Sequence, residues 1–177
     1  NVYQEGYVQN IDDWKPISGA FEAVAMLNRA GWHVVIATNQ PGISRGVLDM
    51  STLNSIHQLM YQQLAQAGGK VDAVFFCPHT ADDQCTCRKP LPGMLLDIST
   101  RFGVDAAEIH VIGDALRDVE AAQAAGCQPY LVCTGESETY SPAQPPEGLP
   151  ANTRVFASLQ DFAKDLIART SEPELAI

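Results

Sequence analysis

Four potential metal ligands crowd into one short segment of the sequence. They are Cys77, His79, Cys85 and Cys87. Three thiolates and one imidazole complete a tetrahedral zinc site and leave no open position, so a zinc ion held here would be structural. Three of the five cysteines of the chain fall in this segment, and the total is odd, which favours metal over disulfides in a reducing compartment. The alternatives are free cysteines on a surface loop with an incidental histidine, or a catalytic zinc with a vacant ligand position.

Side chains that suit phosphate chemistry follow several apolar runs. Asp114 comes after an apolar run and a glycine, where a carboxylate could hold Mg²⁺ or could cap a helix. Asp118, four residues later, is better explained as a carboxylate in the first turn of a helix than as a metal ligand. Thr38 and Asn39 could hydrogen-bond a phosphate, although Asn is also common in plain turns. Lys89 could balance phosphate charge, although an Arg-Lys pair is usually a solvated surface pair.

One arginine is a candidate for binding a second anionic group on a substrate. Arg45 lies in a glycine-bounded loop, residues 41–46, where a solvent-facing arginine is an equally good explanation. Arg88 precedes the lysine and shares its alternative, a solvated surface pair. The sequence contains neither a Walker phosphate loop nor a Gly-x-Ser-x-Gly elbow.

Alternating helical and strand-like segments must position these side chains. Strand patterns occupy residues 33–37, 71–76, 109–112, 129–132 and, as an edge strand, 154–156. Helix patterns occupy residues 18–30, 51–64, 92–102, 117–125 and 158–168. This alternation predicts an α/β fold, a doubly wound parallel sheet, in a single domain that covers residues 1–177. Because the carboxyl ends of parallel strands meet at one edge, we expect the hydroxyl, lysine and carboxylate named above to converge there.

Composition narrows the functional classes. Eleven Lys and Arg stand against 21 Asp and Glu, a formal net charge of −10, which argues against a protein that coats nucleic acid. No apolar run approaches the roughly 20 residues of a membrane span, and the first ten residues carry no basic signal-peptide region. We therefore expect a cytoplasmic protein that needs neither nucleic acid nor membrane.

Four segments together resemble the haloacid-dehalogenase (HAD) superfamily phosphatases. They are Ala-Thr-Asn-Gln at residues 37–40, the cysteine loop, Arg-Lys-Pro-Leu-Pro-Gly-Met at residues 88–94, and Val-Ile-Gly-Asp at residues 111–114. The resemblance implies a HAD-like fold without a large cap domain, and hydrolysis through an aspartyl-phosphate intermediate with Mg²⁺.

The resemblance also implies roles for individual residues. Thr38 would donate to the phosphate, Lys89 would balance its charge and Asp114 would bind the catalytic Mg²⁺. Arg45 and Arg88 would contact the substrate. The Pro-Gly-Met ending of residues 88–94 and the Gly-Ile-Ser-Arg-Gly segment are most similar to members that release the C7 phosphate of a heptose 1,7-bisphosphate during lipopolysaccharide precursor synthesis. That similarity implies a small phosphorylated sugar as partner and a monomeric enzyme.

The family's first motif, Asp-x-Asp-Gly, has no match in the sequence. A motif of this kind would end a strand just before a segment like the one that opens with Asn1, so we expect the nucleophile, the acid/base aspartate and the first strand to precede that residue. Asp12 and Asp13 are adjacent and match no motif, so neither can replace them. Without that segment the chain is not expected to turn over phosphate esters.

Two other functions remain open from the sequence. A histidinol-phosphate phosphatase would share the zinc loop and differ in substrate. A non-catalytic zinc module would explain the absent Asp-x-Asp motif, but it would have no need for the threonine, lysine and aspartate together.

Overall fold

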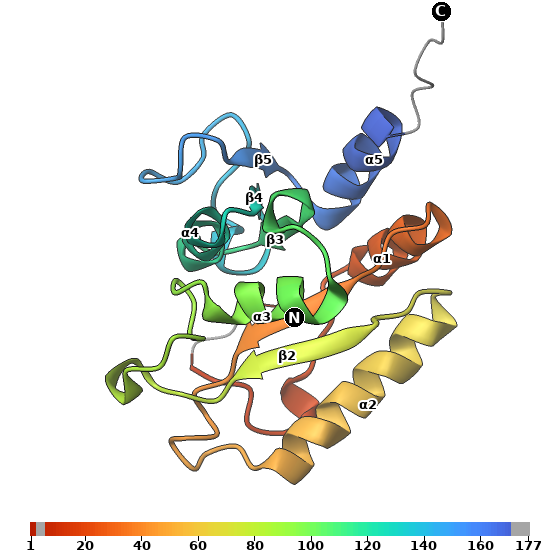
Figure 1. Cartoon of the computed structure of the whole chain (residues 1–177). Helices are drawn as coiled ribbons and strands as arrows, with labels where there is room; N and C mark the ends of the chain where they lie inside the picture. The colour runs from red at the N-terminus through yellow and green to blue at the C-terminus, as the bar shows by residue number, and fades with distance from the viewer. Residues whose placement is uncertain (3–5, 171–177) are drawn as a thin grey trace, which may run out of the picture.

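Five helices and five strands alternate along the part of the chain that the computed structural model describes, residues 1–2 and 6–170 (Figure 1). The helices are α1 (Ala20–Arg29), α2 (Met50–Gln66), α3 (Gly93–Phe102), α4 (Leu116–Ala125) and α5 (Leu159–Thr170). The strands are β1 (Val35–Asn39), β2 (Ala73–Cys77), β3 (His110–Gly113), β4 (Gln128–Val132) and β5 (Arg154–Phe156). Every predicted helix and strand is therefore confirmed, with shifts at the ends.

The end shifts have local causes. Strand β1 begins and ends two residues later than its apolar run suggested, because its pairing with β2 extends through Thr38 and Asn39. Helix α2 begins at Met50 because the Asp49 carboxylate accepts from the Thr52 main-chain nitrogen at 2.7 Å and caps the first turn. The sequence pattern had placed that cap at Ser51.

The strands are parallel but form two sheets, β1–β2 and β3–β4–β5. Both sheets share the same helical layers. Ala37 on β1 and Val111 on β3 pack against the cluster that α3 and α4 build, whereas Ile112, the next residue of β3, packs against α1 and α5. In Figure 1, α3 lies in front of β1, between β2 below it and α4 above it. The two sheets therefore belong to one three-layer α/β arrangement.

A cavity of about 850 Å³ lies between the two sheets, near the amino ends of β1 and β3. Apolar side chains from both sheets and from three helices line it, among them Val35, Ile112, Ile98 and Phe162. Strands β1 and β3 each pair with one neighbour only within the described residues. The sheet is thus open between β1 and β3 within the described residues, as expected if the family's first strand precedes Asn1.

None of the helices in the described ranges is both long and apolar enough to cross a membrane.

Candidate functional site

Lys89 is the centre of a cluster at the carboxyl ends of the strands. It lies in the segment between β2 and α3, and its Nζ donates to the main-chain oxygen of Ala37 in β1 at 2.8 Å. The same nitrogen contacts Oδ1 of Asp118 in α4 at 2.7 Å. Only 12% of the lysine side chain and 7% of the aspartate side chain are exposed. A buried charge pair of this kind is tolerated because both partners have further polar contacts.

Asp118 performs two tasks from the first turn of α4. Besides Lys89, its carboxylate accepts a hydrogen bond from the Ala115 main-chain nitrogen at 3.1 Å, which closes the helix start. Gly113 makes this approach possible, because a Cβ there would collide with the Asp118 side chain. The first-turn position expected from the sequence is confirmed. The ion pair with Lys89 was missed, and a carboxylate four residues after Asp114 was the only signal for it.

Asp114 follows β3 directly, as the sequence predicted. Its Oδ2 accepts a hydrogen bond from the Glu136 main-chain nitrogen at 2.9 Å. We call Lys89, Asp114, Asp118 and the Ala37 carbonyl the lysine site.

Thr38 and Asn39 end strand β1, next to the Ala37 carbonyl. The Asn39 amide nitrogen donates to the Lys89 main-chain oxygen at 3.0 Å, and its amide oxygen accepts from the Lys89 main-chain nitrogen at 3.1 Å. The side chain that the sequence assigned to substrate binding therefore clamps the backbone of the lysine. Thr38 pairs with Phe76 across the sheet and is half-buried beside this clamp.

The two arginines lie on the segments that follow β1 and β2. Arg88 donates from Nη1 to the main-chain oxygen of His79 at 3.2 Å, so it joins the cysteine loop to the segment that carries Lys89. The guanidinium of Arg45 lies 5.2 Å from the centre of the Tyr7 ring, on an exposed loop.

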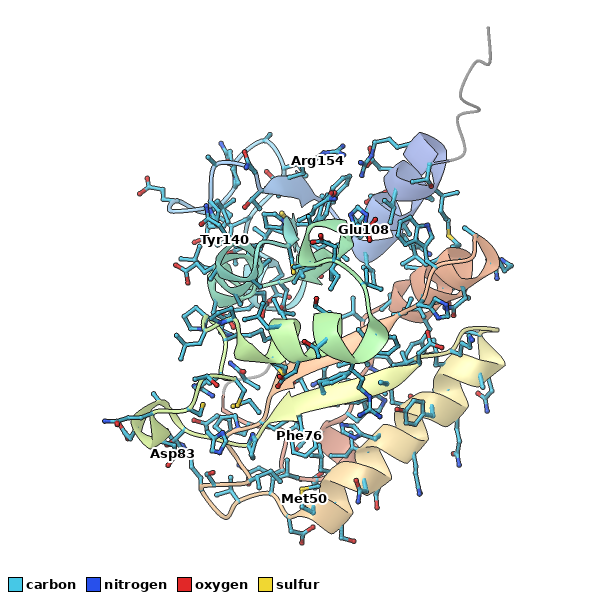
Figure 2. All side chains as sticks on the ribbon, in the orientation of Figure 1. Met50, Phe76, Asp83, Glu108, Tyr140 and Arg154 are labelled. Carbon is cyan, nitrogen blue, oxygen red and sulfur yellow. The ribbon has the colours of Figure 1, made fainter. Side chains whose placement is uncertain are left out.

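The four predicted zinc ligands converge on one point. Their ligand atoms lie within 4.8 Å of one another. The Cys77 sulfur is 3.8 Å from that of Cys85 and 3.2 Å from that of Cys87, and Nδ1 of His79 is 3.4 Å from the Cys87 sulfur. Sulfur atoms on one tetrahedral zinc ion, each about 2.3 Å from the metal, would be about 3.8 Å apart. We call residues 77–87 the metal loop; Figure 2 shows its outer tip at Asp83, away from Phe76 of β2.

Electrostatics in the metal loop also suit a cation. The pKa of Cys85 is lowered to about 7: burial raises it, but hydrogen bonds from the Arg88 main chain and from neighbouring thiols lower it more. Burial and the adjacent Cys77 and Cys85 sulfurs raise the pKa of Cys87 to about 12. Three thiolates this close repel one another unless a cation lies between them, so the donor set fits Zn²⁺.

The remaining candidates have structural explanations. Asp13 accepts from the main-chain nitrogens of Gln9 and Asn10 at 2.8 and 3.1 Å and so holds a local turn. Cys127 belongs to the core cluster between α3 and α4, and burial raises its pKa.

The comparisons with known proteins agree with this geometry. Residues 86–162 match the HAD-hydrolase-like family model. The D-glycero-beta-D-manno-heptose-1,7-bisphosphate 7-phosphatase of Bordetella bronchiseptica is 48% identical over 94% of this chain and 92% of its own length. The enzymes of the same name from Pseudomonas aeruginosa and Neisseria meningitidis serogroup A are 42% and 40% identical, over 94% and 98% of this chain and 92% of their own lengths.

Solved structures give the same result. The B. bronchiseptica D,D-heptose 1,7-bisphosphate phosphatase, complexed with magnesium and phosphate, superposes with a TM-score of 0.87 over 95% of this chain and 93% of that chain, at 48% identity. The Burkholderia thailandensis enzyme superposes with a TM-score of 0.71 over 94% and 96% of the two chains, at 40% identity. The chain belongs to the D-glycero-beta-D-manno-heptose-1,7-bisphosphate 7-phosphatase family of HAD-like hydrolases.

Proposed function

We propose that the protein is a Mg²⁺-dependent phosphatase that releases the C7 phosphate of D-glycero-β-D-manno-heptose 1,7-bisphosphate. The observation that carries this proposal is the buried lysine site beside Asp114, in a chain 48% identical to a heptose bisphosphate phosphatase over nearly its whole length. The relatives named above do not support histidinol phosphate as the substrate, and as phosphatases they do not support a non-catalytic zinc module.

The lysine site would act mainly through fixed charge. Lys89 places one positive charge near the phosphoryl oxygens, and its contacts with Asp118 and the Ala37 carbonyl fix where that charge lies. Thr38 would donate a hydrogen bond to the phosphoryl group from the neighbouring strand end. Asp114 would supply a carboxylate oxygen to Mg²⁺, which when bound offsets the charge on the phosphoryl oxygens.

The nucleophile would come from a strand that precedes Asn1 and lies between β1 and β3. Two observations support this placement: the apolar cavity between the two sheets, and the edges of β1 and β3 that have no neighbouring strand within the described residues. An inserted strand would pair both edges and fill the cavity, and it would end beside the lysine site. Its two aspartates would act as nucleophile and as acid/base group. The inserted strand and residues 1–177 would then form one domain.

The metal loop would hold structural Zn²⁺ and position the substrate arginines. Zinc bound by Cys77, His79, Cys85 and Cys87 would fix the loop that reaches Arg88 through the His79 carbonyl. Arg88, and Arg45 on the facing loop, would then contact the second phosphate of the substrate.

Phosphate release tests the proposal. The protein would be expressed with any residues that precede Asn1 in its gene and assayed with Mg²⁺ on heptose 1,7-bisphosphate, histidinol phosphate and heptose 1-phosphate. We expect rapid release of one phosphate from the bisphosphate and slow or no release from the other two. Equal or faster release from histidinol phosphate would refute the substrate assignment, and no release from any of the three would refute the phosphatase itself.

A further inference from the structure

A tight turn after strand β4 reaches back to Asp114. Strands β3 and β4 are parallel neighbours, with Gly113 opposite Leu131, so the segments that follow them start side by side. The turn at Gly135–Ser137 follows β4, and within it the Glu136 main-chain nitrogen donates to Asp114 Oδ2 at 2.9 Å. In Figure 2 the labelled Tyr140, which continues this segment, lies beside α4.

Only glycine fits at the first position of this turn. Gly135 is buried and has φ +58°, in the left-handed region that side chains rarely adopt. A Cβ at Gly135 would also overlap the Asp114 carboxylate. The turn can therefore approach Asp114 closely enough for the hydrogen bond because residue 135 has no side chain.

An ion pair fixes the turn to the helix that follows Asp114. Nη1 and Nη2 of Arg117, in the first turn of α4, donate to Oε1 and Oε2 of Glu136 at 3.0 and 2.7 Å. Both side chains are about 40% exposed, 42% and 41%, so we expect the pair to add little to the free energy of unfolding. The two-pronged geometry instead restricts where the Glu136 main chain can lie.

We propose that Gly135, Glu136 and Arg117 are positioning residues that orient the Asp114 carboxylate for Mg²⁺. The Glu136 N–H donates to Oδ2 of Asp114 and so restricts rotation of the carboxylate, which would keep an oxygen lone pair directed toward Mg²⁺. This inference rests on the proposed function, in which Asp114 binds Mg²⁺. Partners of this type commonly change metal affinity by about 10- to 100-fold when removed.

Two variants and two matched controls test the inference. Arg117→Met removes the ion pair, and Gly135→Ala pushes the turn away from Asp114. Arg154→Met breaks the Arg154–Asp165 pair, of similar length and exposure, on β5 and α5. Gly103→Ala imposes the same backbone strain at φ +65°, where a Cβ would meet nothing within 4 Å.

Mg²⁺ affinity is the readout, measured by calorimetry and by the Mg²⁺ dependence of phosphate release, in the protein with any residues that precede Asn1. We expect the Mg²⁺ dissociation constant to rise about 10-fold in Arg117→Met and at least as much in Gly135→Ala. The two controls should bind Mg²⁺ as the unchanged protein does. The charge exchange Arg117→Glu with Glu136→Arg should restore most of the affinity, which a merely structural role would not predict.

Failure of this inference and failure of the proposed function look different. If the unchanged protein binds Mg²⁺ and releases phosphate, but Arg117→Met and Gly135→Ala bind Mg²⁺ equally well, the positioning role is refuted. A rise in KM for the sugar phosphate at unchanged Mg²⁺ affinity refutes it as well, since Arg117 would then contact substrate. If the unchanged protein neither binds Mg²⁺ nor releases phosphate, the proposed function fails and the inference fails with it.

Discussion

The metal loop and the lysine site are neighbours in the chain but are built in opposite ways. All four candidate ligands of the metal loop come from residues 77–87, and their ligand atoms lie within 4.8 Å of one another. The lysine site joins residues from β1, from the segment before α3, from the end of β3 and from α4. A local cluster depends on the path of one loop, whereas an assembled cluster depends on the packing of the whole sheet.

This contrast predicts opposite effects of substitution in the two regions. Changes in the metal loop should reduce metal content and stability more than turnover at saturating substrate. Changes in the lysine site should reduce turnover most, and should affect stability only where they leave a buried charge without a partner.

The largest effect is expected from Lys89→Met. Removing the fixed charge should lower kcat by about 10²- to 10³-fold. It should also lower the free energy of unfolding by about 3 kcal/mol, because the Asp118 carboxylate, only 7% exposed, would lose its charged partner. Steady-state kinetics and urea unfolding measure the two effects separately.

A second variant separates charge burial from catalysis. In Lys89→Met with Asp118→Asn the uncompensated carboxylate is gone, while the amide oxygen can still accept from the Ala115 nitrogen. We expect most of the stability to return and the turnover to stay low. Near-normal turnover in either variant would show that Lys89 is not part of the catalytic site.

Cys85→Ser should have the next largest effect, and mainly on stability. Serine is a poor zinc ligand, so we expect the zinc content to fall and the Tm to drop by about 5 °C or more. The control is Cys133→Ser, since Cys133 is a half-buried cysteine outside the cluster. Unchanged zinc content and Tm in Cys85→Ser would refute the zinc site, and a loss of turnover as large as that of Lys89→Met would erase the contrast between the regions.

The same contrast explains what the sequence could predict. The spacing of Cys77, His79, Cys85 and Cys87 was enough to identify the cluster, because ligands so close in sequence meet whatever the rest of the fold does. The alternation of helices and strands predicted the parallel fold, because hydrophobic periodicity is a local property. The opening between β1 and β3 could be expected only from the family's first strand.

Assembled contacts were harder to predict. Thr38, Lys89 and Asp114 were placed at one sheet edge by topology, but their partners were not identified. Asp118 looked like an ordinary helix-start residue, because its pairing with Lys89 spans two secondary-structure elements. Glu136 acts through its main chain, and a main-chain donor has no residue-type signature in the sequence.

Asn39 holds the main chain of Lys89, in the segment that follows the metal loop, and its substitution should lower kcat moderately. Its side chain holds the Lys89 main chain through a donor and an acceptor, at 3.0 and 3.1 Å. If Asn39 positions the lysine, Asn39→Ala should lower kcat by about 10-fold and leave KM nearly unchanged. Asn39→Asp keeps the acceptor oxygen, so its kcat should lie between that of Asn39→Ala and that of the unchanged protein. A higher KM at normal kcat would instead support direct contact with substrate.

The control for Asn39 is another asparagine in the same chain. Asn28 donates to the Trp32 main-chain oxygen at 3.2 Å and accepts from the Lys70 main-chain nitrogen at 2.8 Å, near the end of α1. Asn28→Ala removes the same kind of clamp away from the site, so it should lower the Tm without changing kcat.

The smallest effect concerns His110, at the opposite end of β3 from Asp114. Burial lowers its pKa, and the charge of Arg169 lowers it further. A histidine whose folded-state pKa lies below the unfolded value of about 6.5 favours the fold less as pH falls through that range, since the unfolded chain binds the proton more readily. We expect the Tm to drop by about 1–3 °C as the pH falls from about 6.5 to 5.

His57 contributes in the same direction through burial, and aspartates with lowered pKa values matter only below about pH 4. His110→Gln should flatten the profile partly, and His110→Gln with His57→Gln almost fully. If the contrast between the two regions holds, the loss of stability at low pH should reach the lysine site, which adjoins β3. Any zinc release should then follow only the protonation of the Cys and His ligands, so it should be the same in His110→Gln. Zinc release that His110→Gln suppresses together with the loss of Tm would show that the metal loop depends on the packing of the sheet.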